Sequence, residues 1–508
     1  MLLTSVVWSQ DLRVGSGAAI TTLPGGVLFA GSDAFVDGGA SLTTTSNVTA
    51  SGSFIAIGTT TGDITYKRYI ANDNWRLVSA PVTTQNIPTF VGANESVVAF
   101  NSGNDNHAVS YYNNTNASGS RWTYHNTVNT SENQEALANF ITGQGYSMKR
   151  IATGDYTFTG AMANTDVSVP IPAIGGSTHL WSAIGNPFPS FLPVNTAANA
   201  ENNILKQNLA VLDDNFAALY VWNGTSYEAL LLTDAALQLA PGQAFMVRSN
   251  ANGNQFVFKK ELQNHNSGAA TFYRTSTPTP TISVHLTNGT SNKSASLEFL
   301  DSATAGLDVG YDAGAYQDGT PSFSINTHLV SDSQGIDFTR QSLPISFLDG
   351  EVAIPLSINA GIDEEVTFSV ATNDLPEGIS VYLEDALNNT FTNLTVAPLE
   401  IKITAALSGI GRFYIHTSRG VLSTEDNLLG SLIQVYKTSN GTVKITGLTS
   451  GSAATFSLFT ILGKEVLATK FIAQNVQEIL VPASLSTGVY IVGVVSDLGT
   501  FHKKIVIE

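Results

Sequence analysis

Short apolar segments separated by turn residues recur along this whole chain of 508 residues and constrain its fold more than any other feature. In Ile282–Leu286 and Ala295–Phe299, for example, apolar and polar residues alternate. A period of two places one set of side chains on each face of a β-strand. Gly, Thr, Ser and Asn are abundant while Lys, Glu and Arg are few, which also favours strands and turns over helices. The sequence therefore predicts an all-β protein of tandem β-sandwich domains.

The C-terminal part, residues 432–508, contains seven short strand candidates separated by Gly, Asn and Pro. They are Ile433–Tyr436, Thr442–Thr446, Ala454–Thr460, Glu465–Phe471, Glu478–Val481, Gly488–Val495 and Thr500–Ile507. Strands that recur at a spacing of about 8–12 residues are typical of a small antiparallel sandwich. We therefore predict a seven-stranded Ig-like sandwich at the C-terminus.

Three motifs in this part carry a resemblance to a known family: Phe459–Val466, Leu485–Val492 and Lys503–Ile507. In this order they resemble the C-terminal sorting domain (type A) of type IX secretion cargo proteins of Bacteroidetes. The family usually opens with a Tyr-Pro-Asn-Pro turn, whereas here Tyr436 is followed by Lys437-Thr-Ser-Asn-Gly441. Because Asn-Gly forms a tight turn by itself, this difference concerns the type of turn.

The resemblance implies export through the periplasm to the cell surface or the medium, with the sorting domain recognised by the secretion machinery and normally removed. It also implies a sorting signal made of Gly463, Lys464, Gly488, Tyr490, Lys503 and Lys504. Each of these residues has a structural explanation as well. The glycines could form tight turns, the tyrosine could be a core residue, and the lysines could be a solvated edge that discourages strand addition.

The first ten residues, Met1–Gln10, resemble the apolar end of a signal peptide with its cleavage site, without the basic start. We predict that they are the remnant of a signal peptide and that the mature protein begins near Gln10 or Asp11. The alternative is a short, buried first strand.

Residues 11–65 contain very short apolar bursts, such as Gly26–Phe29, Ala34–Val36 and Ser53–Ile57, separated by Gly, Asp and Thr. They predict several short strands that form a β-solenoid-like segment. Because a few coils cannot bury a core alone, we expect the segment to pack on the next domain as an N-terminal cap. A repeat adhesin is the alternative.

Residues 66–260 contain a degenerate internal duplication. Four motif pairs keep the same order: Trp75–Pro81 with Trp181–Pro187, Ser110–Asn113 with Leu219–Asn223, Gly143–Lys149 with Gly242–Arg248, and Tyr156–Phe158 with Gln255–Phe258. We predict two copies of one β unit, packed either as a pseudo-symmetric pair or as one elongated sandwich. A capping box at Ser131–Gln134 and the stretch Asn203–Leu212 are candidates for short helices.

These motifs resemble a module that is common upstream of type IX sorting domains. Within them, Trp75, Trp181 and Trp222 are candidate glycan contacts, since a rigid planar ring suits stacking on the face of a sugar. The alternative is that these tryptophans form a duplicated core, in which each buries a large apolar area. Exposure of the rings distinguishes the two interpretations.

The remaining boundaries follow from composition. Residues 261–281 and 418–431 are predicted linkers, the first containing Pro278 and Pro280, which block strand pairing and stiffen the chain. Between them, residues 282–417 are predicted to form a β-sandwich, and residues 432–508 form the sorting domain.

The formal net charge is −17, and the 23 Lys and Arg residues are scattered. Nucleic acid and anionic membranes bind a positive surface, so both are disfavoured as partners. The chain has no cysteine, which excludes disulfides and thiolate metal sites. No apolar run reaches the length of about 18 residues that a membrane span needs.

The sequence contains no pattern that predicts catalysis. A phosphate-binding glycine loop, a Gly-x-Ser-x-Gly elbow and a zinc-type histidine pair are all absent. Asp308 and Asp312 stand in an acidic, Gly-rich region that could bind calcium, although solvated loop acids are the alternative. Glu384 and Asp385 are neighbours on a predicted strand, whose side chains point to opposite faces, so they are a poor glycosidase pair. We predict no enzyme, no catalytic residues and no cofactor apart from this weak calcium candidate.

The predicted function is therefore a secreted, cell-surface structural or adhesive β protein that is a partner of the type IX secretion machinery. The alternative is a carbohydrate-binding surface protein that holds surface or host polysaccharide through the duplicated Trp and Tyr motifs.

Overall fold

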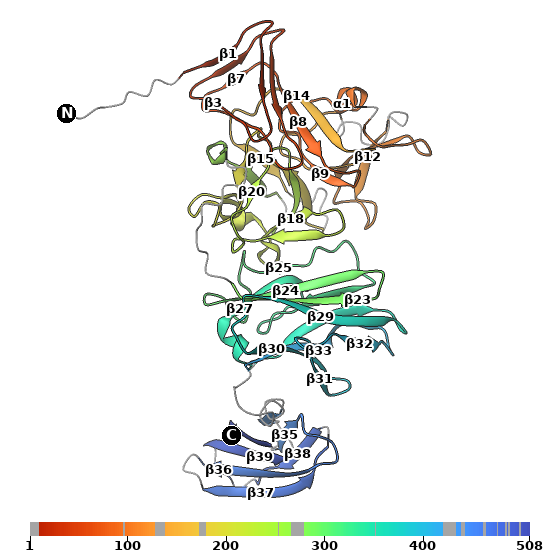
Figure 1. Cartoon of the computed structure of the whole chain (residues 1–508), viewed down its shortest axis with the longest axis vertical. Coiled ribbons are helices and arrows are strands. Elements are labelled where there is room, and N and C mark those ends of the chain that lie inside the picture. The colour runs from red at the N-terminus through yellow and green to blue at the C-terminus, as the bar shows by residue number, and fades with distance from the viewer. Residues whose placement is uncertain are drawn as a thin grey trace, which may run out of the picture. The chain divides into compact units, whose positions relative to one another are not determined.

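The computed structural model describes residues 10–94, 97–126, 138–171, 179–251, 253–265, 279–350, 352–419, 433–437, 442–460, 464–474, 476–482, 485, 488–496 and 499–507 (Figure 1). The chain divides into two compact units. The first unit comprises residues 1–277 and 307–320, and the second comprises residues 278–306 and 321–508. Strands dominate both units, which confirms the all-β prediction. The predicted signal-peptide remnant lies outside the described residues, apart from Gln10.

The N-terminal segment forms three parallel ladders. The first contains β1 (Leu12–Val14), β4 (Ala34–Val36) and β7 (Thr60–Thr61); the second β2 (Ala19–Thr22), β5 (Ser41–Thr45) and β8 (Ile64–Ile70); the third β3 (Val27–Ala30) and β6 (Ser53–Ala56). Val14, Leu42 and Phe54 are buried. Parallel strands stacked in successive coils are the architecture of a β-solenoid, as the short apolar bursts predicted.

The duplicated motifs form two sheets with the same strand order. In the first copy, β9 (Arg76–Val78) pairs β13 (Tyr146–Met148), which pairs β11 (Asn106–Tyr112), which pairs β12 (Trp122–Asn126). In the second copy, β16 (Trp181–Gly185), β21 (Ala244–Arg248), β18 (Leu219–Trp222) and β19 (Tyr227–Leu230) follow in the same way. Register is kept too, since Tyr146 pairs with Val78 and Phe245 pairs with Ile184.

The two copies exchange equivalent backbone hydrogen bonds. The Ser79 N–H donates to Gly242 O at 3.0 Å, and the Gly185 N–H donates to Gly143 O at 2.8 Å. Such reciprocity is the property of a two-fold interface, so the copies form a pseudo-symmetric pair. Gly143 has φ +80°, and a Cβ there would lie 2.4 Å from a Val169 methyl carbon, which explains why glycine stands in this motif.

The remaining elements of the first unit complete its core. They are β10 (Phe100–Asn101), β14 (Gly154–Gly160), β15 (Val167–Pro170), β17 (Leu192–Pro193), β20 (Gln238–Leu239), β22 (Gln255–Phe258), α1 (Ile87–Ala93), α2 (Ile204–Asn208) and 3₁₀ turns at Leu209–Val211, Asp214–Phe216 and Lys260–Leu262. Helix α2 lies in the predicted stretch, and its N-cap Asn203 accepts the Lys206 N–H at 2.9 Å. The predicted capping box at 131–134 lies outside the described residues.

Residues 307–320 belong to the first unit although the chain on both sides of them belongs to the second. The Tyr220 hydroxyl donates to Gly314 O at 2.7 Å, and the Leu232 N–H donates to Gly310 O at 3.0 Å. Gly314 packs so closely on the Phe216 ring that an added Cβ would lie 2.4 Å from a ring carbon. This segment therefore completes the core of the second copy, a role that the prediction of a separate 282–417 domain did not anticipate.

The rest of the second unit before residue 419 is one hydrogen-bonded strand path in the order β31-β30-β33-β28-β26-β27-β24-β23-β29-β32. The bounds are β23 (Thr281–Thr287), β24 (Asn292–Leu300), β26 (Ser324–Thr327), β27 (Phe338–Pro344), β28 (Ile354–Ala360), β29 (Glu365–Asn373), β30 (Ile379–Asp385), β31 (Thr390–Asn393), β32 (Leu399–Lys402) and β33 (Leu407–Arg419), with a 3₁₀ turn at Ile345–Asp349. One core joins residues from both ends of the path, such as Leu297 and Leu383.

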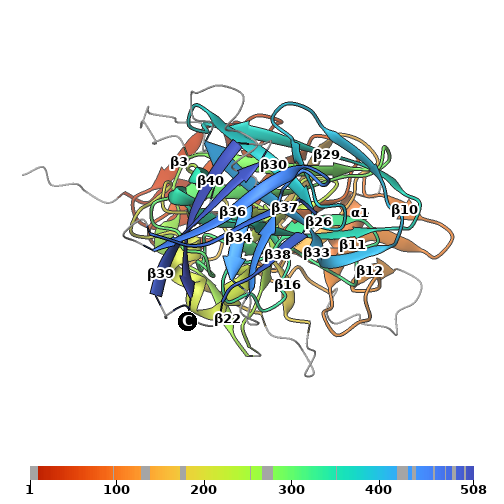
Figure 2. The same cartoon turned by 90° about the horizontal axis from the view of Figure 1, so that it is seen from below.

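The C-terminal domain has two sheets, of three and four strands. The first is β34 (Gln434–Lys437), β35 (Thr442–Thr446) and β38 (Val476–Leu480); the second is β37 (Glu465–Ile472), β36 (Ala453–Thr460), β39 (Gly488–Ser496) and β40 (Gly499–Ile507), seen from below in Figure 2. Val435, Phe456 and Val492 belong to its own apolar core. The strands lie where the alternation predicted them.

Candidate functional site

A groove of about 340 Å³ opens on the sheet of the first copy and contains Trp75. It is lined by Trp75, Ala99, Phe100, Asn101, Asn104, Asn106, His107, Ala108, Tyr124 and Lys149. These residues lie on or beside β9, β10, β11, β12 and β13, so the strand pairing of one sheet holds the whole lining in place.

Aromatic rings form the walls of this groove. Trp75 and Tyr124 meet edge to face, with ring centroids 5.8 Å apart and an angle of 66° between the planes. Phe100 is 49% exposed and lies 4.7 Å from the His107 ring. The rings are therefore not coplanar, and they enclose a slot instead of forming a flat platform.

Polar groups form the rim, on the turn between β10 and β11. Asn101 Oδ1 accepts the Gly103 N–H at 2.9 Å, and Asn126 Nδ2 donates to Asn104 O at 2.7 Å. Within the described residues, the side-chain NH₂ groups of Asn101 and Asn104 donate no hydrogen bond. The rim therefore holds amide donors on an ordered turn beside the aromatic walls.

Uncharged histidine lies against this groove. His125 is 3% exposed, and its ring lies 5.8 Å from that of His107. Burial lowers the pKa of His125, and the nearby His107 lowers it further. Its imidazole is therefore neutral at pH 7, and it lies behind the His107 ring that lines the groove.

Trp181, the equivalent of Trp75 in the second copy, is 2% exposed and lies in the core. The Phe216, Tyr220 and Tyr316 rings pack against it, with centroids 5.6, 4.8 and 4.7 Å away. Tyr316 comes from the 307–320 segment. The two equivalent tryptophans thus differ because this segment covers only the second, and Trp181 has no free face for a sugar.

Trp222 and Trp122 are each partly exposed but do not join the groove. Trp222 lies 5.0 Å from the Tyr227 ring and lines a different pocket. Trp122 packs on Tyr112 with ring centroids 5.0 Å apart. The three candidate glycan contacts are therefore dispersed, and only Trp75 stands in an aromatic groove.

The acidic candidates of the second unit are engaged in pairs. Arg412 Nε and Nη2 donate to the two carboxylate oxygens of Asp385 at 3.0 and 2.8 Å, and Glu384 Oε2 lies 2.7 Å from His416 Nε2. Burial raises the pKa of Asp385, but the Arg412 hydrogen bonds outweigh it and hold the pKa below its ordinary value. The two carboxylates serve the pairing of β30 with β33.

Asp312 is fully buried, and its Oδ2 accepts the Asp308 N–H at 2.7 Å. Within the described residues, no group of three or more His, Asp or Glu side chains is arranged to hold a metal ion. These two aspartates therefore form a local turn contact. The calcium site remains a prediction, for which the described residues do not supply a set of ligands.

The candidate sorting residues are spread over the C-terminal domain. Tyr490 on β39 is 6% exposed and lies in the core, and Gly488 opens the same strand. Lys503 and Lys504 are successive on β40, where their backbones pair with those of Val492 and Ile491. Lys464 immediately precedes β37, and Gly463 lies outside the described residues. Their role as a signal stays a prediction.

Sequence reasoning missed most of the groove. Tyr124, Phe100 and Lys149 have no distinguishing spacing, because strand pairing alone brings them to Trp75. The one available signal is the run Asn101-Ser-Gly-Asn-Asp-Asn106, which is a strong turn composition beside a tryptophan-bearing motif.

Two families match the chain. A family described as a domain of unknown function (DUF8693) matches residues 3–416, and the secretion system C-terminal sorting domain matches residues 437–508. No curated protein is significantly similar to the chain. In the part that the structure describes, neither short α-helix has the length and apolar character of a membrane span.

The similarity to solved structures is at a low level, as one example shows. This structure is described as the tetra-tandem repeat in the extending region of a large adhesion protein. The similarity covers 58% of this chain and 93% of that chain, with 9% identity and a TM-score of 0.12, which does not establish a shared fold.

The sorting domain makes the chain a type IX secretion cargo, exported to the cell surface or beyond it, and confirms the resemblance of the three C-terminal motifs. Together with the match over residues 3–416, the chain belongs to the DUF8693 family of domains of unknown function, joined here to a type IX sorting domain.

Proposed function

We propose that this chain is a structural or adhesive component of the bacterial cell surface that reaches it through the periplasm. The observation that carries the proposal is the sorting domain at residues 437–508, which follows a passenger of β units. The passenger's candidate catalytic carboxylates, Glu384 and Asp385, pair with His416 and Arg412, which supports a non-enzymatic role.

Deletion of residues 433–508 tests the export step. We expect the passenger to accumulate in the periplasm, because the machinery would lose the domain that it recognises. Fractionation of a secreting host followed by immunoblotting measures this. A truncated passenger that reaches the surface as efficiently as the full chain contradicts the assignment.

A second function, carbohydrate binding, is favoured by the Trp75 groove. A sugar ring has apolar C–H faces and hydroxyl edges, so it fits a slot that combines aromatic walls with amide donors. Trp75 and Tyr124 supply the walls, and Asn101 and Asn104 supply the donors. A volume of about 340 Å³ lies in the range of small-ligand sites, about 300–1,000 Å³.

Glycan binding by the purified full chain tests this function, with neutral polysaccharides and a glycan array as probes. We expect saturable binding that Trp75→Ala or Tyr124→Ala abolishes. Tyr436→Ala is the matched control, because Tyr436 is an exposed aromatic residue of the sorting domain. If the chain binds none of the neutral glycans, the result contradicts carbohydrate binding at this groove and supports the structural or adhesive function alone.

Trp181→Ala is not a binding test, because Trp181 belongs to the core. Removing a buried aromatic side chain costs about 3–5 kcal/mol in the free energy of unfolding, so this variant would lose binding through loss of fold. Unfolding followed by tryptophan fluorescence separates the two cases: Trp75 is half-buried beside the core, so Trp75→Ala should shift the transition less than Trp181→Ala, whose ring is fully buried.

A further inference from the structure

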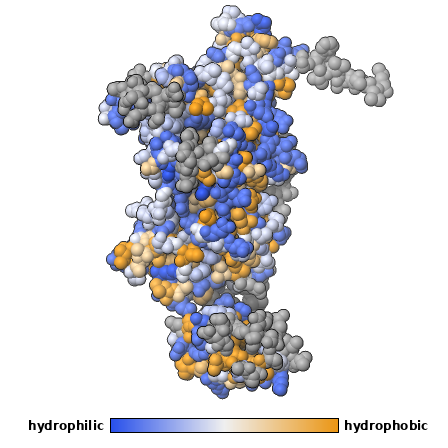
Figure 3. Space-filling model, turned by 180° about the vertical axis from the view of Figure 1, so that it is seen from behind, coloured by the Kyte–Doolittle hydropathy of each residue, from blue (hydrophilic) through white to orange (hydrophobic). Residues whose placement is uncertain are grey.

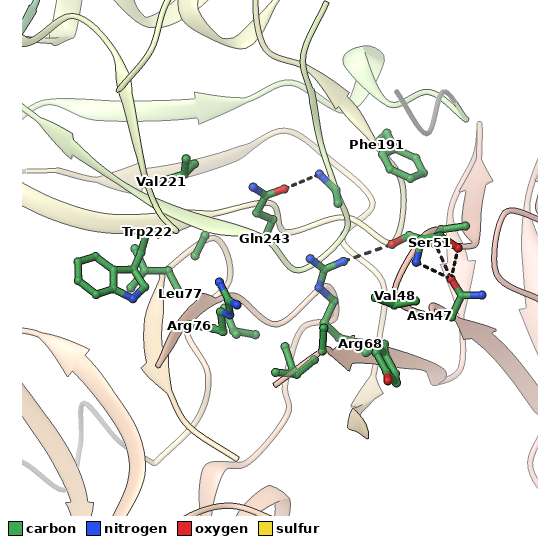
Figure 4. A pocket seen from close by; sticks show the side chains of 18 residues that line it. Asn47, Val48, Ser51, Arg68, Arg76, Leu77, Phe191, Val221, Trp222 and Gln243 are labelled. Carbon is green, nitrogen blue, oxygen red and sulfur yellow. Dashed lines mark hydrogen bonds between the residues drawn. The ribbon is translucent and has the colours of Figure 1, made fainter. Parts of the chain in front are cut away.

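A second pocket of the first unit, of about 370 Å³, is distinct from the Trp75 groove. It forms where the turn Asn47–Ser51, strands β8 and β9, and strands β18 and β21 of the second copy come together. Figure 4 shows its side chains, with Trp222 at one end, Ser51 at the other and Gln243 above. The volume again suits a small ligand.

Two arginines occupy the middle of this pocket. Arg68 lies on β8, and Arg76 is the first residue of β9. Figure 4 places both guanidinium groups between Trp222 and Ser51. The residues that line the pocket include no aspartate or glutamate, and no described carboxylate lies within 4 Å of either guanidinium. In a chain of net charge −17, this is a local concentration of unbalanced positive charge.

Arg68 makes few hydrogen bonds within the described part of the protein. A guanidinium group has five N–H donors, and the one hydrogen bond of the Arg68 side chain to a described residue runs from Nη1 to Ser51 Oγ at 3.2 Å. Burial lowers the pKa of Arg68, an effect that the nearby Tyr66 opposes. Taking a cation out of water is costly unless an opposite charge accompanies it. An anion beside Arg68 would therefore be stabilised.

Arg76 is held by neutral acceptors. Its Nη1 donates to Asn223 O and its Nη2 to Asn72 Oδ1, each at 3.2 Å. These contacts fix the guanidinium in place at the turn that follows β18 without neutralising it. A fixed, planar cation is suited to pairing with a carboxylate or a sulfate group.

At the corresponding turn of the first copy, the arginine is paired with a carboxylate of the chain itself. There Arg121 Nη1 donates to Asn114 O at 2.8 Å, and Arg121 Nε donates to the Asp318 carboxylate at 2.7 Å. Asn113 and Asn223 are the equivalent residues that end β11 and β18. The chain thus supplies a carboxylate to the arginine at one turn and none to the arginine at the other.

The rest of the lining favours a sugar as the carrier of the anion. Gln243 Oε1 accepts the Ala240 N–H at 3.2 Å, which fixes the amide while its NH₂ group remains a donor. Trp222 is a half-buried ring at the end of the pocket, and Ser51 and Thr49 contribute hydroxyls. Hydroxyls, an amide and an aromatic ring around two cations match a polar ring that bears a negative group.

We propose that this pocket binds an acidic saccharide unit, with Arg68 and Arg76 paired to its carboxylate or sulfate group and Gln243 and Trp222 contacting the ring. This is a site in addition to the Trp75 groove, and it does not depend on neutral glycan binding there.

Calorimetric titration of the full chain at low ionic strength tests the proposal. The probes are digalacturonic acid with its methyl ester, and N-acetylglucosamine 6-sulfate with its unsulfated parent. We expect at least one acidic sugar to bind, its uncharged partner to bind at least tenfold more weakly, and added salt to weaken binding. The two pairs distinguish a carboxylate from a sulfate ester as the preferred anion.

Variants tie the binding to the pocket. Arg68→Gln and Arg76→Gln should each reduce affinity tenfold or more, and Arg76→Lys should recover part of the loss because it keeps the charge. Arg13→Gln is the matched control, since the Arg13 side chain is 68% exposed in the solenoid segment and pairs with Asp37. Trp75→Ala should leave acidic-sugar binding intact, which separates this site from the neutral-glycan groove.

Three results would overturn the proposal. They are equal affinity for the acidic sugar and its uncharged partner, inorganic sulfate bound as tightly as either acidic sugar, and no binding of either acidic sugar by the folded chain. Tryptophan fluorescence of each variant confirms that loss of binding is not loss of fold.

Discussion

His179 shows how the surroundings of one side chain set a chemical property of the first unit. Its Nε2 lies 2.6 Å from the Tyr112 hydroxyl, which in turn lies 3.3 Å from the Tyr316 hydroxyl. Burial lowers the pKa of His179 to about 4, and the Arg121 charge acts in the same direction. The neutral imidazole is thus the form that the folded unit accommodates.

This predicts that acid destabilises the first unit. In the unfolded chain the pKa returns to about 6.5, so between that pH and about 4 the unfolded state binds more protons. The contribution of His179 to the free energy of unfolding is complete above about pH 6.5 and falls as the pH falls through this window. We expect His179→Gln to flatten the dependence, measured by urea unfolding with fluorescence, because all five tryptophans lie in this unit.

His285→Gln is the control for this experiment, since His285 lies on β23 of the second unit. It should leave the fluorescence-detected transition and its pH dependence as they are. An identical pH slope in the wild type and His179→Gln would show that other groups cause the acid sensitivity.

The Asp385–Arg412 pair is the corresponding residue-scale feature of the second unit. Asp385 is 2% exposed, so Asp385→Ala leaves a desolvated guanidinium without its partner, and we expect a loss of about 3–5 kcal/mol in the free energy of unfolding. Asp363→Ala removes an exposed pair with Lys402 and should cost at most about 1 kcal/mol. Calorimetry of the second unit measures both, and equal effects would contradict the assignment.

At the scale of elements, the 307–320 segment determines that Trp181, and not the half-buried Trp75, is covered completely. Asp318 holds it to the first copy: Arg121 Nε and the Gly119 N–H donate to its carboxylate at 2.7 and 3.2 Å. Burial raises the pKa of Asp318, but these hydrogen bonds outweigh it and the pKa lies below its ordinary value. The segment is therefore anchored by charge as well as by packing.

Asp318→Asn is expected to loosen this segment at a cost of about 1–3 kcal/mol, since the charge-assisted hydrogen bonds weaken. The readouts are a red shift of tryptophan emission, because Tyr316 covers Trp181, and faster chymotrypsin cleavage at Tyr316. Asp73→Asn, at an exposed site of the same unit, is the control. Emission and cleavage unchanged from the wild type would contradict the anchoring role.

The elements also show what sequence can and cannot predict. The solenoid coils and the C-terminal strands were predicted because their alternation and turn residues are local. The duplication was visible because motif order survives divergence, and the strand order of the two copies agrees with it. The difference between Trp75 and Trp181 was not predictable from the sequence. The Tyr316 ring that covers Trp181 comes from a segment that follows β23 and β24 in the chain, so only the tertiary fold brings the two rings together.

The positively charged pocket was equally impossible to predict from the sequence. Arg68 and Arg76 are ordinary residues of two strands, and nothing in the sequence marks them as a pair without a carboxylate. Long-range pairing alone determines which acids reach which arginines, so a positive pocket inside an acidic chain emerges only in three dimensions.

At the scale of the whole molecule, the sorting domain has a core of its own, which contains residues from Ile433 to Ile505 only. Hydrophobic residues are exposed on the visible face of this domain (Figure 3), and Ile472, Leu480 and Val495 are among its exposed side chains. Such a domain can be removed without opening the cores of the passenger.

This predicts that a chain lacking residues 433–508 keeps the unfolding transitions of the passenger and loses one transition. Differential scanning calorimetry of the full and truncated chains measures it, with tryptophan fluorescence as the control for the first unit. A lower transition temperature of the passenger after truncation would show that the sorting domain stabilises it.

The position of residues 307–320 also has a consequence for the order of events during synthesis. A nascent chain that has emerged as far as residue 306 contains every strand of both duplicated sheets. The Trp181 ring still lacks its contact with Tyr316 at that stage. The unit can close only after the first hairpin of its neighbour, β23 and β24, has also emerged. Folding of the first unit is therefore completed only after part of the second unit has been synthesised, so the first unit stays incompletely folded for longer before export.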